Sequence, residues 1–405
     1  MKRYKERTIG LAIVGLTLVF VLFCACNDNK MNMQQTIEKG LERATILSIA
    51  MAKSLESDTA LLPKTFEEGE LVTSNSKWWC SGFFPGTLWY LYENNPTEEL
   101  KKYAIDYTSR VEDQKYTTNN HDVGFMIYCS FGNGLRLLGI ESYNAVIVEA
   151  SKSLSTRYKD HIGLIRSWDW NTETWQYPVI IDNMMNLEML MWAAKYTGDD
   201  RFSEIAVNHA DKTMKEHFRE DYSCYHVVDY DTITGDSRLK MTWQGYSDSS
   251  SWSRGQAWAV YGYSMMYRET GDPKYLEQAE NIAKFIINHP RLPEDKVPYW
   301  DFDAPAIPNE LRDASSAAIM ASAFIELSQH TNDKRLAKRC IETAEKQIVS
   351  LTSGEYLAEP GTNGNFILKH SVGAIPRDLE IDAPLTYADY YYVEAMTRYK
   401  RLMNF

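Results

Sequence analysis

Cysteine is scarce in this sequence, with six in 405 residues. Two of the six lie near the N-terminus, and the other four are Cys80, Cys129, Cys224 and Cys340. These four are far apart in the chain and form no Cys-x-x-Cys pair, which is the spacing that small zinc sites use. The sequence therefore indicates neither a zinc site nor a disulfide framework.

An excess of positive charge is also missing. The chain has 43 Lys and Arg against 55 Asp and Glu, a formal net charge of −12. Nucleic-acid binding needs a basic face to neutralise phosphates, and no Lys/Arg cluster here amounts to one. Nucleic acid is therefore excluded as a partner, and an anionic ligand has to be met by a few local cations.

The sequence lacks the motifs of nucleotide, metal and nucleophile chemistry. The glycines of FGNGLRLLG (131–139) follow no predicted strand, and DYDTITGD (229–236) lacks the closing Glu of a calcium loop. There is no HExxH, GxSxG or phosphate loop, so no cofactor or metal is expected. Acid–base work by carboxylates remains, and glycosidic bonds are its commonest target.

The N-terminus has the pattern of an export signal. Basic residues in 2–7 precede an apolar run over 9–23, which ends in the letters FCAC. This ending resembles a bacterial lipoprotein cleavage box with Cys26 as the lipid-bearing residue, although its Phe is a poor match; an ordinary signal peptide or an uncleaved anchor is the alternative. We expect residues 1–26 to be a signal and the protein to be exported, lipid-anchored and periplasmic, touching the membrane through that anchor alone.

The remainder of the chain predicts helices in pairs joined by short turns. Apolar residues recur with a period near 3.6 on both sides of three similar turns, Thr197-Gly198-Asp199, Thr270-Gly271-Asp272 and Thr331-Asn332-Asp333. In each pair the first helix is nearly uncharged in its first half, whereas the second carries a regular charged stripe. A helix buried on all sides has to be apolar all round, so the first helix is inner and the second is outer.

The same alternation extends along the whole mature chain. Residues 82–94 pair with 97–112, and 120–138 with 141–159, while helices near 33–55 and 384–403 close a ring. Twelve helices in six pairs predict an all-α fold, an (α/α)6 barrel formed by one domain over residues 27–405. An open solenoid would need polar capping repeats at its ends.

The connections from each outer helix to the next inner helix are long and rich in tryptophan. They cover residues 72–84, 116–125, 164–186, 220–258, 291–313 and 353–389. Nine of the eleven Trp lie in these segments. Since all inner helices of a toroid start at one end, the segments converge there, and we expect them to form the walls of a pocket.

Two aspartates stand at the starts of inner helices, Asp122 in NNHDVGF and Asp182 in YPVIIDNMMNLEML. Each could be a helix N-cap, for which Asp is a favoured residue. Asp182, however, has only apolar and amide neighbours in sequence. Desolvation and a nearby second carboxylate both raise a carboxyl pKa, so Asp182 beside an ionised Asp122 would stay protonated near neutrality and serve as a proton donor.

Four tryptophans of the long connections offer flat apolar faces on which sugar rings stack: Trp79, Trp168, Trp252 and Trp258. Ordinary core packing is the alternative for each of them taken singly. A convergent set of four indicates a carbohydrate site.

Three further polar side chains are candidates for substrate contact. Arg254 lies between Ser253 and Gly255, which would leave its guanidinium free for a bidentate contact with a carboxylate; a structural ion pair is the alternative. His121 and His226 could donate hydrogen bonds, although a lone histidine is more often structural than catalytic.

Five segments in order resemble the unsaturated glucuronyl hydrolases, glycoside hydrolase family 88. They are WWCSGFFPG, HDVGF, IIDNMMN, WQGYSDSSSWSRGQAWAVYGY and DAPLTYADYYYVEAM, which together span nearly the whole mature chain. The resemblance implies an (α/α)6 barrel that needs no metal. It also implies removal of the 4,5-unsaturated uronic acid that polysaccharide lyases leave at the non-reducing end of oligosaccharides.

On that resemblance Asp182 is the general acid/base. It would protonate C4 of the enol ether and then help water to add at C5, giving a hemiketal that opens and releases the sugar. Asp122 matches the second essential aspartate of the family. The substrate-contacting positions of the family match His121, His226, Gln244, Arg254, Trp79, Trp252 and Trp258.

Two features favour the glucuronyl branch over the related unsaturated rhamnogalacturonyl hydrolases. These are the Arg-Gly-Gln-Ala-Trp form of residues 254–258 and the His-Asp-x-Gly-Phe box at 121–125. Cys80-Ser81 departs from the polar residues expected after Trp79. The sequence alone also leaves open a non-catalytic glycan-binding lipoprotein, and an inverting glycosidase or sugar epimerase on the same barrel.

Overall fold

The computed structural model describes residues 32–405, which form twelve α-helices. Their bounds are α1 (Met33–Ser54), α2 (Phe83–Asn94), α3 (Glu98–Ser109), α4 (Asn133–Leu138), α5 (Glu141–Ser155), α6 (Leu187–Thr197), α7 (Asp200–Glu216), α8 (Ser253–Thr270), α9 (Pro273–Asn288), α10 (Ala314–His330), α11 (Lys334–Leu351) and α12 (Thr386–Met403). A π-helix, η2 (Gly124–Gly132), runs directly into α4, and a 3₁₀ turn, η3 (Ile181–Asn186), runs directly into α6.

The even-numbered helices form an inner ring and the odd-numbered helices an outer ring. In α10 every residue from Ala314 to Leu327 is buried, whereas α11 buries only the stripe that faces α10 and exposes its Lys, Arg and Glu side chains. This is the pattern expected where one helix is enclosed by neighbours and its partner meets water on one side. The predicted assignment of inner and outer helices is confirmed.

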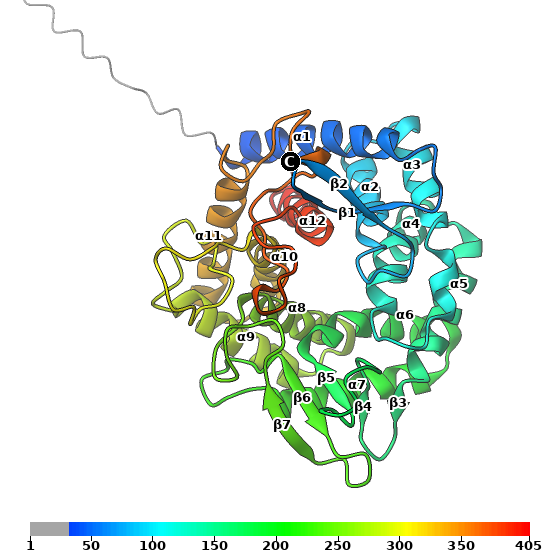
Figure 1. The fold of residues 1–405 in the computed structure, drawn as a ribbon, viewed down its shortest axis with the longest axis vertical. Helices are drawn as coiled ribbons and strands as arrows, with labels where there is room; N and C mark the ends of the chain where they lie inside the picture. Colours follow the sequence, from blue (N-terminus) through cyan, green and yellow to red (C-terminus); the bar gives the residue numbers. More distant parts are fainter. Residues whose placement is uncertain (1–31) are drawn as a thin grey trace, which may run out of the picture.

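The inner ring is closed. Each inner helix contacts the next in chain order, with η2 rather than α4 making the contact to α6, and the last, α12, packs against the first, α2, while α1 covers α12 from outside. Figure 1 shows the resulting toroid, with α1 in blue and α12 in red meeting where the ring closes. The (α/α)6 barrel expected from the sequence is confirmed.

Local chemistry explains the tight turns between inner and outer helices. Gly198 and Gly271 end α6 and α8 with φ of 74° and 70°, a left-handed conformation in which a Cβ atom is strained. The aspartate that follows each glycine caps the next helix: Asp199 accepts a hydrogen bond from the backbone N–H of Arg201, and Asp272 from that of Lys274.

The long connections contain small sheets that the sequence analysis did not predict. They are the hairpins β1 (Leu62–Glu67) with β2 (Glu70–Ser74) and β3 (Tyr158–Lys159) with β4 (Leu164–Ile165), and the three-stranded sheet of β5 (Pro178–Ile180), β6 (Val227–Tyr230) and β7 (Ser237–Met241). The strands are two to six residues long, too short for an alternating pattern to stand out in the sequence. They give the connections a fixed shape.

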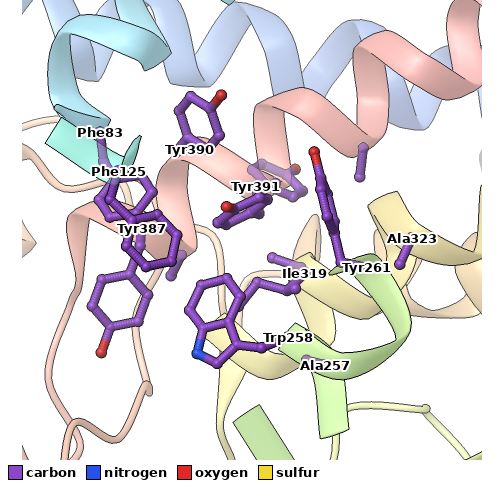
Figure 2. Packing of buried hydrophobic residues seen from close by; sticks show 14 of the residues in the cluster. Phe83, Phe125, Ala257, Trp258, Tyr261, Ile319, Ala323, Tyr387, Tyr390 and Tyr391 are labelled. Carbon is purple, nitrogen blue, oxygen red and sulfur yellow. The ribbon is translucent and has the colours of Figure 1, made fainter. Parts of the chain in front are cut away.

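An aromatic layer fills the centre of the ring. Phe83 of α2, Phe125 of η2 and Trp258 of α8 converge there with Tyr387 and Tyr391 of α12, as Figure 2 shows. Ring centroids of neighbours in this layer lie 5.2 to 5.9 Å apart, for example 5.3 Å between Phe125 and Trp258. The layer supports the starts of the inner helices, where the tryptophan-rich connections meet.

The predicted signal segment, residues 1–26 with the lipid-bearing Cys26, lies outside the described residues. Within residues 32–405, no helix combines the length and the apolar character needed to span a bilayer. In the same part of the chain Cys80, Cys129, Cys224 and Cys340 are free thiols.

Candidate active site

Asp182 lies at the point where the three-stranded sheet meets the inner ring. Strand β5 ends at Ile180, and the next turn is η3, which carries Asp182 in its first residues and leads into α6. The antiparallel register sets Ile180 opposite Val227, and the backbone N–H of Ile181 donates to the carbonyl of His226 at 3.1 Å. This pairing brings the His226 side chain next to Asp182.

Asp122 lies beside Asp182, at the start of the neighbouring inner element, which is η2 followed by α4. It precedes η2, whose first turn fits closely against η3: the backbone N–H of Phe125 donates to Oδ1 of Asn186 at 3.0 Å. A Cβ atom on Gly124 would lie 2.7 Å from Cα of Asn186, so glycine allows the two segments to touch. The two aspartates that the sequence singled out are therefore neighbours at the mouth of the toroid.

Neither aspartate is a simple helix cap. The N-cap residues of η2 and η3 are Val123 and Ile180, and neither side chain makes a capping hydrogen bond. Asp182 is 7% exposed and the Asp122 side chain 13%. Two carboxyl groups are thus held close together and nearly out of water, which is costly unless a proton is retained.

Burial raises the pKa of Asp182 to about 7, with the Arg254 charge pulling it back down. Burial also raises the pKa of Asp122 to about 8, and the facing charge of Asp182 adds to that rise. The sequence predicted Asp122 to be the ionised partner, but the pKa of both carboxyl groups is raised. The reason is that both side chains are held nearly out of water, where the charged form of a carboxyl group is disfavoured.

Each aspartate faces a neutral histidine. Nδ1 of His226 accepts hydrogen bonds from the backbone N–H groups of Trp243 and Gln244, at 3.1 and 3.2 Å, so its proton is on Nε2, 3.7 Å from Oδ2 of Asp182. Among residues 32–405 neither of these two facing atoms has a hydrogen-bond partner. Burial lowers the pKa of His226 well below its ordinary value, which keeps the ring uncharged.

His121 is arranged in the same way beside Asp122. Ser167 Oγ accepts from the N–H of Ile180 at 3.0 Å and lies 3.4 Å from Nδ1 of His121, so its O–H is free to donate to that nitrogen, which leaves the ring proton on Nε2. That atom is 3.4 Å from Oδ1 of Asp122. Burial lowers the pKa of His121 to about 3.

The four predicted tryptophans surround this centre. Trp252 packs against His226 at a tilt of 43° with centroids 4.5 Å apart, and Trp168 meets the same ring edge-on at 6.0 Å. Trp258 Nε1 has no partner within hydrogen-bond range among residues 32–405, but its N–H interacts with Asp182 and lowers the pKa of the carboxyl group. Trp79 packs 5.6 Å from Phe125 on the Asp122 side.

The aromatic wall is larger than the sequence analysis proposed. Trp168 continues into a cluster with Trp170, Trp175 and Trp243, whose centroids are 4.9 to 5.3 Å apart, and Trp170 remains 45% exposed. Arg377 covers Trp243, its guanidinium carbon 3.1 Å from the ring centroid. The cluster gives the mouth a flat apolar flank of the kind on which sugars stack.

The expectation that the Arg254 guanidinium is free was wrong. Nη1 donates to Asp313 at 3.3 Å and to the carbonyl of Val372, and Nη2 donates to Gln244 Oε1 at 3.1 Å and to the carbonyl of Gly373 at 2.6 Å. Of its nitrogens only Nε has no partner among residues 32–405. Arg254 and Gln244 both lie at the site, but the arginine also holds the connection that precedes α12 through its hydrogen bonds to the carbonyls of Val372 and Gly373. Their roles as substrate contacts stay predictions.

The sequence analysis passed over residues that build the centre. Asn183 donates from Nδ2 to the carbonyl of Ile165 at 3.1 Å, and its amide faces His121. Asn186 binds Phe125, as described above, and the Tyr387 ring lies 5.0 Å from that of Trp79. Both asparagines follow Asp182 in a segment with no other polar residue, a signal that could have identified them.

A cavity of about 700 Å³ is lined by residues of all six inner helices and does not include either aspartate. Its charged residues pair with one another: Arg268 contacts Glu188 at 2.5 Å and Glu326 at 2.6 Å, and Arg398 contacts Glu394 at 3.3 Å. The cavity reaches the two turns that carry the aspartates at Gly124 and Met185, and it is also lined by Tyr391 of the aromatic layer.

A closed (α/α)6 toroid whose mouth holds two proton-retaining carboxyl groups, neutral histidines and a wall of indoles defines an acid–base hydrolase of carbohydrates. No family model matches the chain. The chain is 49% identical over 329 residues to the unsaturated glucuronyl hydrolase of Formosa agariphila, covering 81% of each chain. It belongs to the unsaturated glucuronyl hydrolase family.

Two more comparisons agree with that membership. The unsaturated chondroitin disaccharide hydrolase of Streptococcus agalactiae is 30% identical over 378 residues, 91% of this chain and 92% of the relative. The crystal structure of an unsaturated glucuronyl hydrolase specific for heparin superposes with a TM-score of 0.88 at 43% identity, covering 91% of this chain and 98% of the other. The family and fold expected from the sequence motifs are confirmed.

Proposed function

We propose that this enzyme removes a 4,5-unsaturated uronic acid from the non-reducing end of oligosaccharides that lyases release from glycosaminoglycans. The relatives support this substrate class, since one is named for chondroitin disaccharides and a solved neighbour for heparin. The observation that carries the proposal is the pair Asp122 and Asp182, held almost out of water beside neutral histidines and facing indoles.

The reaction assigned to this geometry is hydration of the enol ether. Asp182 donates its proton to C4, and positive charge develops at C5 and the ring oxygen. Water then attacks C5 and returns a proton to the Asp182 carboxylate. The resulting hemiketal opens, and the hemiacetal left at C1 releases the sugar.

Each neighbour of Asp182 has a part in this cycle. A pKa of about 7 keeps a fraction of Asp182 protonated at neutrality and also lets it take a proton back, which one group has to do in both steps. The Nε2–H of His226 and Oδ2 of Asp182 face each other at 3.7 Å, and both can hydrogen-bond a water molecule placed between them. Asp122 faces Asp182 and orients the sugar.

The test is loss of the ultraviolet absorbance of the conjugated double bond when the purified protein meets unsaturated chondroitin or heparin disaccharides. Asp182→Asn should lower kcat by about 10²–10⁴-fold, the usual value of a general acid, with an unchanged circular dichroism spectrum. Full activity in Asp182→Asn would refute the proposal. Turnover of the saturated disaccharides would instead favour the inverting glycosidase or epimerase alternative.

We also propose that the protein is exported and held at the periplasmic face of a membrane by a lipid on Cys26. The basic segment, apolar run and terminal cysteine of residues 2–26 support this. Metabolic labelling with a radioactive fatty acid should mark the wild type and not Cys26→Ala, whereas labelling of both, or of neither, would contradict the lipid anchor.

A further inference from the structure

The outer helix α7 carries a polar stripe on the face that it buries. Its first turns bury Phe202 and Ile205, as an outer helix of a toroid should, but the same face continues with His209, Thr213 and, at the C-cap, His217. The spacing of four places these three side chains one above another, and each of them is 0% exposed. These three residues lie in the C-terminal half of α7. An outer helix ends where the next inner helix begins, so this half is the one nearest the mouth of the toroid.

This stripe is exceptional among the outer helices. Among the described residues, the buried faces of α1, α3, α5, α9 and α11 contain no histidine. Burying an imidazole costs free energy unless both ring nitrogens find partners. Packing alone therefore gives no reason for two histidines in the core.

His209 holds one of the two segments that support the catalytic turn. Its Nδ1 accepts a hydrogen bond from the backbone N–H of Ile165 in β4, at 3.0 Å. The carbonyl of the same Ile165 accepts the hydrogen bond from Asn183, at 3.1 Å. Asn183 is the residue after Asp182, so His209 fixes the peptide on which the turn rests.

His217 holds the other segment. Its Nε2 lies 3.1 Å from the carbonyl of Val179 in β5 and donates to it. Val179 precedes Asp182 by three residues, and β5 runs directly into the η3 turn. Both backbone segments that position Asp182 and Asn183 are thus attached to the same stripe of α7.

The tautomers leave a matched set of free atoms along the stripe. His209, accepting at Nδ1, has its proton on Nε2, and His217, donating from Nε2, has a free acceptor at Nδ1. These two atoms and Oγ1 of Thr213 between them have no hydrogen-bond partner among residues 32–405. One donor, one acceptor and a hydroxyl that can act as either form the setting that a buried water molecule requires.

We propose that His209, Thr213 and His217 bind an internal water molecule and act as positioning residues for the Asp182–Asn183 turn. The role in catalysis rests on the proposed hydrolysis, whereas the water site does not. The stripe is also uncharged, because burial lowers the pKa of His217 to about 4 and that of His209 well below its ordinary value. The stripe therefore holds the turn without adding a positive charge, which would lower the pKa of Asp182 and favour loss of its proton.

Thr213→Val is the sharpest test, because it removes the hydroxyl and keeps the shape of the side chain. The matched control is Thr343→Val, a buried threonine on the face of another outer helix, α11. With an unsaturated disaccharide as substrate, Thr213→Val should lower kcat by about tenfold and leave KM within about twofold, since a small misplacement of the acid costs turnover before binding. Thr343→Val should change neither. Equal kcat in the two variants would overturn the inference.

The histidine variants separate positioning from stability. His209→Asn keeps an acceptor for the Ile165 N–H, and His217→Gln keeps a donor for the Val179 carbonyl, so both should retain more kcat than His209→Leu and His217→Leu. If the leucine variants melt at lower temperature but keep the wild-type kcat per folded molecule, the stripe is structural only and the inference is wrong.

A crystal structure of the wild type at high resolution tests the water site without any assay. We expect an ordered water within hydrogen-bond distance of His209 Nε2, Thr213 Oγ1 and His217 Nδ1. The same water should be absent from the crystal structure of Thr213→Val. A dry, collapsed contact between the three side chains would overturn the water site. An inactive wild type with the water in place would instead count against the proposed function.

Discussion

Nε2 of His226 and Oδ2 of Asp182 face each other at 3.7 Å, beyond hydrogen-bond range, with the imidazole held neutral by two backbone N–H donors at its other nitrogen. A charged histidine at this distance would stabilise the carboxylate and lower its pKa. A neutral one supplies an N–H and leaves the proton on the acid. The geometry therefore favours an acid that is still protonated near neutrality, and the first two predictions depend on that environment.

The first concerns pH. Asp182 acts as an acid only when protonated, and its pKa is about 7, so kcat/KM should hold below pH 7 and fall as the pH rises through that value. Asp182→Asn removes the facing negative charge that, together with burial, raises the pKa of Asp122. The carboxyl titration of Asp122, followed by ¹³C NMR, should then move to lower pH than in the wild type. A titration that stays in place or moves up would contradict the coupling.

The second concerns the indole of Trp258. Its N–H stabilises the Asp182 carboxylate and lowers the pKa of that group. Trp258→Phe keeps an aromatic ring in the central layer but removes the donor, so the pKa of Asp182 should rise and the alkaline limb of the kcat/KM profile should shift to higher pH. Tyr261→Phe, a change in the same helix that does not touch Asp182, provides the control. A shift of the alkaline limb toward lower pH would refute this contact.

The third concerns the buried pair of Arg254 and Asp313. Asp313 is 0% exposed and accepts from Arg254, Ser315 and Ser316. Asp313→Ala leaves these donors without their acceptor and should lower the free energy of unfolding by about 3 kcal/mol, measured by urea denaturation.

The comparison for that variant is Asp333→Ala. Asp333 caps α11 as Asp313 caps α10, but it is exposed, so its loss should lower the free energy of unfolding by clearly less than the loss of Asp313. Equal losses in the two variants would mean that Asp313 is no more than a helix cap.

The fourth concerns the contact between η2 and η3. A Cβ atom at position 124 would lie 2.7 Å from both Cα and Oδ1 of Asn186, so Gly124→Ala has to push the two turns apart. We expect kcat to fall by about tenfold or more, because the turns carry Asp122 and Asp182. Gly354→Ala, at a glycine whose added Cβ would meet nothing within 4 Å, should have no effect on kcat. Wild-type turnover by Gly124→Ala would show that the spacing of the turns does not matter.

Predictions from the local sequence pattern were confirmed where the structure depends on which face of a helix is buried. The uncharged first halves of the inner helices and the Thr-Gly-Asp turns were readable in the sequence, because burial selects apolar residues and a left-handed residue selects glycine. The short strands were missed, since two to six residues do not establish a period. The Arg254 guanidinium was misjudged because its partners, Val372 and Gly373, lie more than one hundred residues away in the chain.

The sequence by itself determined the ring of helices, the end at which its long connections meet, and the two aspartates that the family motifs carry. Only the tertiary structure decided how protons are distributed there. A pKa depends on burial and on the charges and hydrogen bonds around a group, and those come from η2, η3, β6 and α8, which are far apart in the chain. The neutral tautomers of His226 and His209 were likewise set by backbone N–H groups that tertiary folding places against them.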